Sequence, residues 1–439
     1  MNIAIVIQRY GSEVLGGAEQ LCRLVAERLA ARHQIDVLTT CARDYITWAN
    51  AYPEGTDRVR GVTVRRFPVT RTRDIGTFNQ MSDRLFGHRA SRADELEWLK
   101  HQGPWSPALV EYLRRHHQQY DVVVFFTYLY ATTVLGMEVC PGKSLVVPTA
   151  HDEPAIHLGL FTDVFSKAAG LLYLTESERR FVARTFPQRP LLEEVVGVGI
   201  DLPLQQAYPR MPQEPEDHEP RALGGARATR ALAEDEAGLS TSPEEPLRLP
   251  HIASRGAVFR RRHRLHGPFA LYGGRIDPGK GCEELLHYFN AFVAAGGDAT
   301  LALMGAKLMP LPEDDPSVRF AGLLSDTERA EALEAADVVI CPSPYESLSL
   351  LALEALSVGT PVLVNARSEV LVEHCVRSNA GLWYADRDEF VACLRLLMQD
   401  GTLRSELGRN GRAYVDAHYR WPVVLEKWER AFASVRQAR

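Results

Sequence analysis

Short apolar, β-branched runs alternate with helix-like segments along this chain, and the alternation occurs in two separate series. Strands that alternate with helices predict a parallel sheet covered by helices on both faces. We therefore expect two doubly wound α/β domains that face each other across a cleft, because ligands bind at the carboxyl ends of such strands. The strand-like runs lie at residues 3–7, 35–39, 62–67, 122–126, 144–147 and 171–174, then at 269–272, 300–304, 338–341 and 361–364.

The segment between the two series has a different character. Residues 203–262 are rich in Pro, Glu, Ala, Arg and Gly, with few aromatic residues and no periodicity. This composition predicts a linker at 203–265 that carries a disordered insert, between domains at 1–202 and 266–418. The tail is helical in pattern but is broken at Trp421-Pro422. We expect its last part, 419–439, to form a helix that packs back on the first domain.

The composition excludes several classes of protein. Hydrophobic residues make up 46% of the chain and charged residues 24%, as in soluble globular proteins. A net charge of −6 gives no reason to expect nucleic-acid binding, and no apolar run approaches the length of a membrane span. The first seven residues are typical of a strand rather than a signal peptide. Seven scattered cysteines predict small core residues in a reducing, cytoplasmic environment.

Two glutamates, Glu346 and Glu354, stand eight positions apart where a loop is expected to run into the helix 348–358. Glu354 should then lie about two turns inside that helix, roughly 12 Å beyond Glu346. The helix N-terminus between them offers backbone N–H groups and a positive dipole end, which suit a diphosphate. The alternative is an ordinary amphipathic helix with two solvated glutamates, because such spacings are common.

Two glycine-containing loops are further candidates for phosphate contact. Gly16-Gly17 follows the first strand and precedes a helical pattern at 18–32, although the spaced dinucleotide fingerprint is absent and a plain turn is an equal alternative. The loop at 272–281 carries Arg275 and Lys280, which could both reach one diphosphate. The alternative for this loop is a surface turn with solvated charges.

A third candidate is His151, which comes shortly after the strand at 144–147, together with Asp152 and Glu153. Polar side chains at the carboxyl end of a parallel strand are well placed for a ligand site. One histidine beside two adjacent carboxylates is a poor metal site, and we predict neither a metal nor another cofactor. A lone histidine with a structural role is the even alternative.

Taken together, these segments resemble a retaining glycosyltransferase of family four, with two Rossmann-like domains in the GT-B fold. The resemblance covers both domains. Its most specific part is Gly274-Arg275 and Lys280-Gly281 followed about seventy residues later by Glu346 and Glu354, and it is supported by Gly305, Gly322 and Gly359-Thr360-Pro361.

The resemblance implies a role for each candidate residue. Arg275 and Lys280 would bind the donor diphosphate, and Glu354 the ribose hydroxyls. Glu346 would face the donor sugar, with His151 near it. The N–H groups of Leu348 and Ser349 would cap the phosphates, and Gly16 and Gly17 would let the first domain approach them closely.

The implied activity is retaining transfer of a hexose from a UDP- or GDP-sugar to a glycan or lipid-linked acceptor, in cell-surface polysaccharide or glycoconjugate biosynthesis. A sugar phosphorylase, a nucleotide-sugar epimerase and a non-catalytic glycan- or nucleotide-binding protein on the same fold are the alternatives. Acceptor recognition is expected in the elaborated region 78–115. Peripheral contact with a membrane is a separate hypothesis, which rests on the basic residues Arg60, Arg65, Arg66, Arg71, Arg73 and the run 260–264. The alternative is that these residues are solvated charges on a soluble enzyme.

Overall fold

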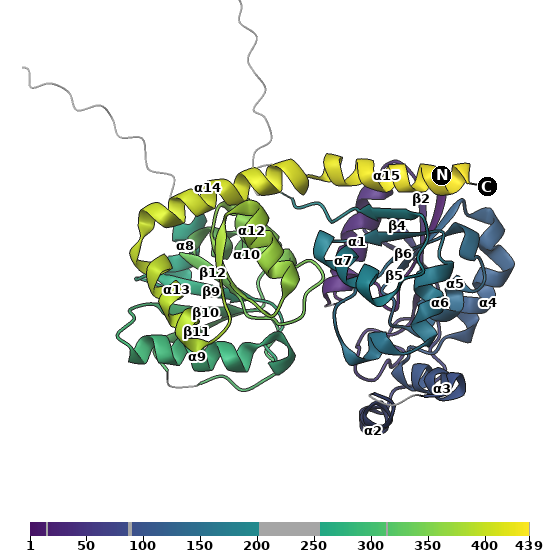
Figure 1. Ribbon diagram of the computed structural model, residues 1–439, viewed down its shortest axis with the longest axis horizontal. Helices are drawn as coiled ribbons and strands as arrows, with labels where there is room; N and C mark the ends of the chain where they lie inside the picture. The colour runs from purple at the N-terminus through teal and green to yellow at the C-terminus, as the bar shows by residue number, and fades with distance from the viewer. Residues whose placement is uncertain (15, 87–89, 202–254, 313–314, 439) are drawn as a thin grey trace, which may run out of the picture.

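The computed structural model describes residues 1–14, 16–86, 90–201, 255–312 and 315–438. Two α/β lobes lie side by side, and the last two helices run along one edge of both (Figure 1). The predicted fold class is confirmed: each lobe is a largely parallel sheet with helices on its faces. Most of the insert expected at 203–265 lies outside the described residues.

The first sheet has, within the described part of the chain, eight strands in the order β3-β4-β2-β1-β5-β6-β7-β8, and β3 alone pairs antiparallel. Its strands are β1 (Asn2–Val6), β2 (Gln34–Thr40), β3 (Gly55–Val59), β4 (Val62–Phe67), β5 (Val122–Phe126), β6 (Ser144–Val147), β7 (Gly170–Tyr173) and β8 (Leu192–Val195). Its helices are α1 (Gly17–Leu29), α2 (Ile75–Leu85), α3 (Arg92–Gln102), α4 (Pro107–His116), α5 (Ala131–Met137), α6 (Leu160–Lys167) and α7 (Glu176–Thr185).

The second sheet is parallel throughout, in the order β11-β10-β9-β12-β13-β14. Its strands are β9 (Phe269–Gly273), β10 (Thr300–Met304), β11 (Val318–Gly322), β12 (Val338–Cys341), β13 (Val362–Asn365) and β14 (Gly381–Tyr384). The helices that follow residue 254 are α8 (Arg255–Arg262), α9 (Cys282–Ala294), α10 (Asp326–Ala335), α11 (Leu350–Val358), α12 (Glu369–Ser378), α13 (Arg387–Gln399), α14 (Gly401–His418) and α15 (Trp421–Gln437).

Sequence patterns predicted the buried strands and missed the edge strands. β1, β5, β9 and β12 consist of buried apolar residues, which is the signal for a strand covered on both faces. β3 and β11 lie at the edges of their sheets and are largely solvent-facing, so their sequences show no apolar run. β8, at the other edge of the first sheet, contains Glu193 and Glu194.

The helices before and after the second domain pack on different domains. α15 follows the second domain in sequence but packs against the first, where the indole of Trp428 stacks on Phe126 with centroids 6.1 Å apart. α8 precedes the second domain and packs against α10, with Arg260 paired to Asp337 at 3.0 Å. The second domain therefore begins by residue 255, earlier than the expected boundary at 265.

A buried carboxylate connects the two domains. Glu373, on α12 of the second domain, accepts hydrogen bonds of 2.5 Å from both the N–H and the hydroxyl of Ser177, near the start of α7. Arg180 and Arg377 lie 3.3 and 3.1 Å from its two oxygens. Next to this contact, the hydroxyl of Thr175 donates to the carbonyl oxygen of Ser347 across the same interface.

In the portions of the chain that the structure describes, no helix is both long enough and apolar enough to cross a membrane. The same portions contain no group of three or more His, Cys, Asp or Glu side chains that could hold a metal ion.

Trp428→Ala should destabilise the first domain, because a fully buried indole that anchors α15 would be replaced by a cavity. Removal of a buried aromatic side chain costs about 3–5 kcal/mol. Urea unfolding followed by far-UV circular dichroism measures the loss. Glu426→Ala, an exposed change on the same helix, is the control and should stay within about 0.5 kcal/mol of the unmodified chain. Equal midpoints for both variants would contradict the anchoring role of Trp428.

Glu373 should make stability depend on pH in the acid range. Burial alone would raise its pKa, but hydrogen bonds from Ser177 and Arg377 outweigh burial and hold the pKa below the ordinary glutamate value of 4.5. Its contribution to stability is therefore complete above pH 4.5 and is lost as the pH falls through the lowered pKa.

The advantage of the unmodified chain over Glu373→Gln in urea midpoint should accordingly shrink as the pH is lowered below 4.5. Glu369→Gln, an exposed change on the same helix, is the control. A difference between the unmodified chain and Glu373→Gln that is constant with pH would show that the charge on Glu373 does not hold the interface.

Candidate active site

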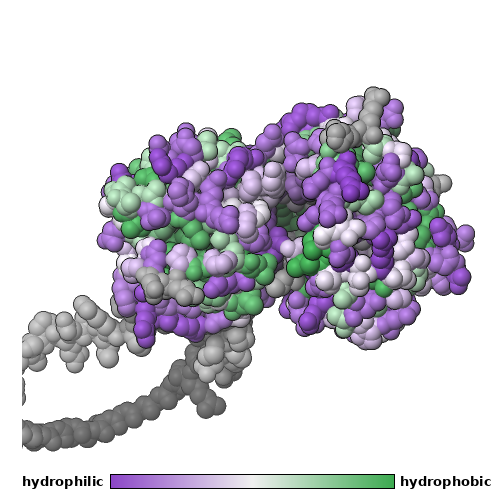
Figure 2. All heavy atoms as spheres, turned by 90° about the horizontal axis from the view of Figure 1, so that it is seen from below, coloured by the Kyte–Doolittle hydropathy of each residue, from purple (hydrophilic) through white to green (hydrophobic). Residues whose placement is uncertain are grey.

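A cleft of about 700 Å³ lies between the two domains, and the space-filling view in Figure 2 shows the furrow between the two lobes. Nearly all of the predicted site residues line this cleft: Gly16, Gly17, His151, Arg275, Lys280, Glu346, Leu348 and Ser349. Glu354 is the one that does not. The cleft forms where the carboxyl ends of strands from both sheets meet, as the fold predicts.

Close packing of two backbone segments forms part of the cleft wall. Gly274 follows β9 and its N–H donates to the carbonyl oxygen of Met304 at the end of β10; Gly305 follows β10 and its N–H donates to that of Gly322 at the end of β11. Gly305 has a φ of 127°, and a Cβ atom there would overlap the carbonyl group of Gly274. Only glycine permits this approach, which places the Arg275 loop at the cleft.

The cationic loop carries two side chains with different partners. The ammonium group of Lys280 lies 2.8 Å from a carboxylate oxygen of Glu346, so these two predicted residues pair with each other. Arg275 lies 3.5 Å from Asp277 and stacks over the ring of Tyr45, with its guanidinium carbon 5.3 Å from the centroid. Tyr45 belongs to the first domain, so Arg275 reaches across the cleft.

Helix α11 begins at Leu350, two residues later than predicted. Ser349 is the reason: its φ of 65° is left-handed and non-helical, and its hydroxyl caps the helix by accepting from the N–H of Ala352. Within the described residues, the N–H groups of Leu348 and Ser349 donate to no other group. These N–H groups and the helix dipole together form a seat for an anion.

Glu354 lies in the second turn of α11 and is half-buried behind the cleft wall. One of its oxygens accepts a hydrogen bond of 2.7 Å from Nε of Arg329, which does line the cleft. This pair could not be predicted from the sequence, because its two residues lie twenty-five positions apart on two helices. Glu354 therefore contacts the lining of the cleft through Arg329.

His151 contacts both domains. Its ring lies 5.7 Å from the ring of Tyr345 in the second domain, and its Nε2 is 3.6 Å from Glu153. Glu153 in turn accepts a hydrogen bond from the hydroxyl of Tyr128 at 2.5 Å, and both of these residues line the cleft. Polar side chains of the first domain thus face the cations of the second.

A buried ion pair that sequence reasoning missed supports the glycine loop of the first domain. Arg9 and Glu19 lie 2.6 Å apart, and Gln8 also donates to Glu19 at 2.9 Å. A Cβ atom on Gly16 would overlap the carboxylate of Glu19 and approach Arg9. The requirement for glycine at position 16 therefore comes from this pair, and Gly17 has open space around it.

A second missed residue, His374, holds the loop before α11 from behind. Its Nε2 lies 2.7 Å from the carbonyl oxygen of Leu348, and its Nδ1 lies 3.1 Å from the hydroxyl of Tyr414. Burial lowers the pKa of His374, so the ring is neutral near pH 7. A neutral ring that donates to Leu348 and accepts from Tyr414 satisfies both contacts.

The arrangement is suited to one kind of ligand. Two cationic side chains and a helix N-terminus converge on one side of the cleft, which suits a diphosphate. Carboxylates at Glu346 and Glu153, with His151, provide acceptors for hydroxyl groups nearby.

Comparison with known proteins agrees with this geometry. Residues 258–414 match the family model described as "Glycosyl transferases group 1". One relative is the GDP-mannose-dependent monoacylated alpha-(1-6)-phosphatidylinositol monomannoside mannosyltransferase of Corynebacterium glutamicum, 27% identical over 36% of this chain and 45% of the relative. The chain thus spans less than half the length of this curated relative.

Solved structures resemble the whole chain. The sucrose-phosphate synthase of Thermosynechococcus elongatus superposes with a TM-score of 0.67 at 18% identity, and both chains are covered completely. The Anabaena protein HepE, solved in complex with UDP-glucose, superposes with a TM-score of 0.64 at 14% identity, also over 100% of both chains. The chain thus has the GT-B fold of these solved structures, and residues 258–414, within its second domain, match the group 1 glycosyltransferase family model.

Proposed function

We propose that this chain is a retaining hexosyltransferase that takes a sugar from a nucleoside-diphosphate donor. The observation that carries the proposal is the convergence of Arg275, Lys280 and the N-terminus of α11 on one interdomain cleft. A departing diphosphate develops negative charge in the transition state, and preorganised cations and N–H groups stabilise that charge. The same cleft provides carboxylates and a histidine for sugar hydroxyls.

The proposed reaction is a same-face transfer. The bond between the anomeric carbon and the phosphate oxygen breaks while the acceptor oxygen approaches from the same face. The leaving phosphate oxygen takes the acceptor's proton, so the configuration is retained and charge and atoms balance. Lys280, which pairs with Glu346 in the structure, then binds the diphosphate, either while it keeps this pair or after it leaves it. When the pair separates, Glu346 is free to face the sugar.

For the donor base and the acceptor, the proposal names classes of molecule. HepE was solved with UDP-glucose, and the corynebacterial relative is named as GDP-mannose-dependent, so both bases are candidates. We place the acceptor, a glycan or a lipid-linked glycan of a cell-surface polymer or glycoconjugate, against the first domain. There α2 and α3 project beyond the sheet and Tyr45 reaches the cleft (Figure 1).

Peripheral membrane contact is given no role in the proposed reaction. The first-domain arginines that suggested it have partners within the domain. Arg65 pairs with Asp36 at 3.0 Å, and Arg66 is buried and donates to the carbonyl of Tyr10. Arg73 donates to the carbonyl of Ile46 at 2.8 Å. In the basic run, Arg260 pairs with Asp337.

Replacement of both cations, Arg275→Ala with Lys280→Ala, should lower kcat/KM for sugar transfer by at least about 100-fold, because the charge of the leaving diphosphate loses its counterions. Product formation from UDP- and GDP-sugars measures the loss. Arg319→Ala with Arg409→Ala removes the same charge from exposed positions outside the cleft and should leave turnover unchanged. Near-normal turnover in the cleft variant would refute the proposed role.

Glu354→Ala should weaken the binding of UDP or GDP by about 10- to 100-fold, because a charged hydrogen bond to the ribose is worth roughly 1.5–3 kcal/mol. Isothermal calorimetry with each nucleotide measures the affinity and shows which base is preferred. Arg329→Ala separates two explanations, since Glu354 also holds Arg329. If Arg329→Ala reproduces the whole loss, then Glu354 acts through Arg329 and does not bind the ribose.

A further inference from the structure

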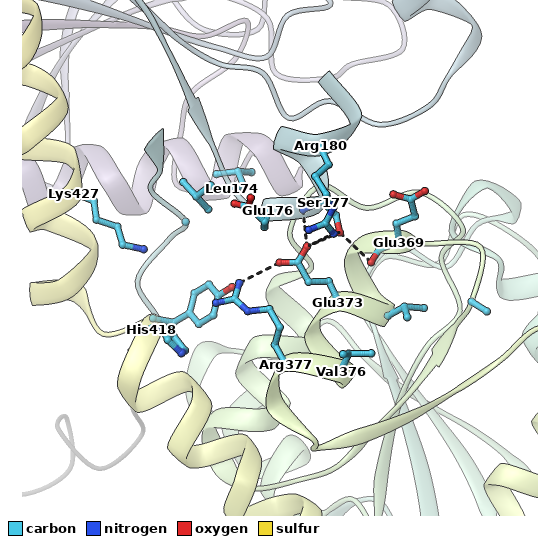
Figure 3. Close-up of a pocket in the computed structure, with 15 residues that line it drawn as sticks. Leu174, Glu176, Ser177, Arg180, Glu369, Glu373, Val376, Arg377, His418 and Lys427 are labelled. Atoms are coloured by element: carbon cyan, nitrogen blue, oxygen red, sulfur yellow. Dashed lines mark hydrogen bonds and ion pairs between the residues drawn. The ribbon is translucent and has the colours of Figure 1, made fainter. Parts of the chain in front are cut away.

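A second cavity, of about 690 Å³, lies between the domains and is separate in its lining residues from the donor cleft. Three structural units enclose it: the start of α7 in the first domain, α12 in the second, and the junction of α14 and α15 where the chain returns to the first domain. Its size falls within the range of small-molecule sites. Figure 3 shows the labelled side chains around the cavity, with Glu373 linked to Arg377 and to Ser177 by dashed lines.

The charges in this cavity do not balance. Arg180, Arg377 and Lys427 line it, and Glu373 is held between the two arginines. The other two lining carboxylates have cationic partners outside the cavity, because Glu176 pairs with Arg179 and Glu369 pairs with Arg184. Glu373 is therefore the one lining carboxylate without a cationic partner outside the cavity, so more positive than negative charge is directed into it.

Lys427 is the clearest source of this excess. It lies on α15 and points toward α12 and His418 (Figure 3). Within the described residues no carboxylate lies within ion-pair distance of it, and the nearby Glu194 is paired with Arg430 at 3.2 Å. Burial and the neighbouring Arg377 lower the pKa of Lys427 against the attraction of Glu194. Burial, followed by the charges of Arg377 and Lys427, lowers the pKa of His418. Lys427 thus forms no ion pair with the described residues inside the cavity, and Glu194, which attracts it from outside the lining, is shared with Arg430.

The remaining walls are apolar. Val195, Val372 and Val376 line the cavity together with the ring of Tyr419. A ligand that fits both features carries a compact anionic group toward Arg377 and Lys427 and a less polar body toward the valines. A phosphate group suits this positive lining, because the separate guanidinium and ammonium donors can bind its several oxygens.

We propose that this interdomain cavity is a binding site for a phosphorylated small molecule, held by Arg377 and Lys427. The site is distinct from the donor cleft, and it does not depend on the proposed transfer reaction. Its occupant would touch both domains and the returning helix at once, so binding would stabilise the observed arrangement of the domains. Two neighbouring residues of α12 connect the cavity to its surroundings: Glu373 contacts Ser177 of the first domain, and His374 contacts Leu348 in the loop before α11. Stabilisation of α12 would therefore also stabilise that loop, which lines the donor cleft.

The test uses inorganic phosphate as the probe and the full chain with Arg275→Ala and Lys280→Ala, so that phosphate binding in the donor cleft is removed. Thermal unfolding in phosphate is compared with chloride at equal ionic strength. We expect phosphate to raise Tm by about 2 °C beyond the effect of chloride. Lys427→Met in this background should abolish that difference.

Arg436→Met, on the same helix but exposed and outside the cavity, is the matched control and should retain the full phosphate effect. It also corrects for the general stabilising action of phosphate on folded proteins. Arg377→Gln is the second test variant, in case Lys427→Met unfolds. Equal phosphate shifts in the cavity variants and in Arg436→Met, or no shift in the parent, would overturn the proposal. Neither result bears on the donor cleft.

Discussion

The packing of α15 on the first domain is the contact on which the rest of the structure depends. Two parallel sheets can form a ligand site only if their carboxyl edges face each other, and a flexible connection alone does not set that orientation. The stacking of Trp428 on Phe126 attaches the end of the second domain to the core of the first. The contact of Ser177 with Glu373 adds a directional hydrogen bond.

The site combines charges from both domains. Lys280 and Glu346 neutralise each other within the second domain, while Arg275 contacts the ring of Tyr45 and His151 contacts that of Tyr345. These two ring contacts cross the cleft, and the first of them orients Arg275 before any ligand arrives. Preorganised charge of this kind needs little rearrangement when a diphosphate leaves.

How much could be predicted from the sequence depends on the range of the interaction. Local patterns predicted the buried strands, the glycine loops and the residues that meet at the cleft, because β-strand burial and helix periodicity are written in neighbouring positions. They did not predict that Ser349 is left-handed and delays α11, because that conformation depends on the surrounding loop. Nor could they reveal that Glu354 holds Arg329, or that His374 supports Leu348, since each contact joins two elements that are separate in the chain.

Two further long-range contacts explain why Gly16 and Glu373 stand at their positions, and the structure was required to see both. Gly16 is required by the buried pair of Arg9 and Glu19, which joins the first strand's loop to α1. Glu373 is required by Ser177, which lies 196 positions away in the other domain. In both cases the sequence contained the residues, and only the fold showed the distance between them.

The path of α15 also means that the modules of this protein in space are not its modules in sequence. The segment that matches the glycosyltransferase family ends at residue 414, but the helix that completes the core of the first domain begins at Trp421. A chimera that exchanges everything after residue 254 would therefore pair one protein's first domain with another protein's α15. A working chimera would have to take α15 from the same protein as the first-domain surface around Phe126. The natural junction for recombination is therefore the turn between α14 and α15.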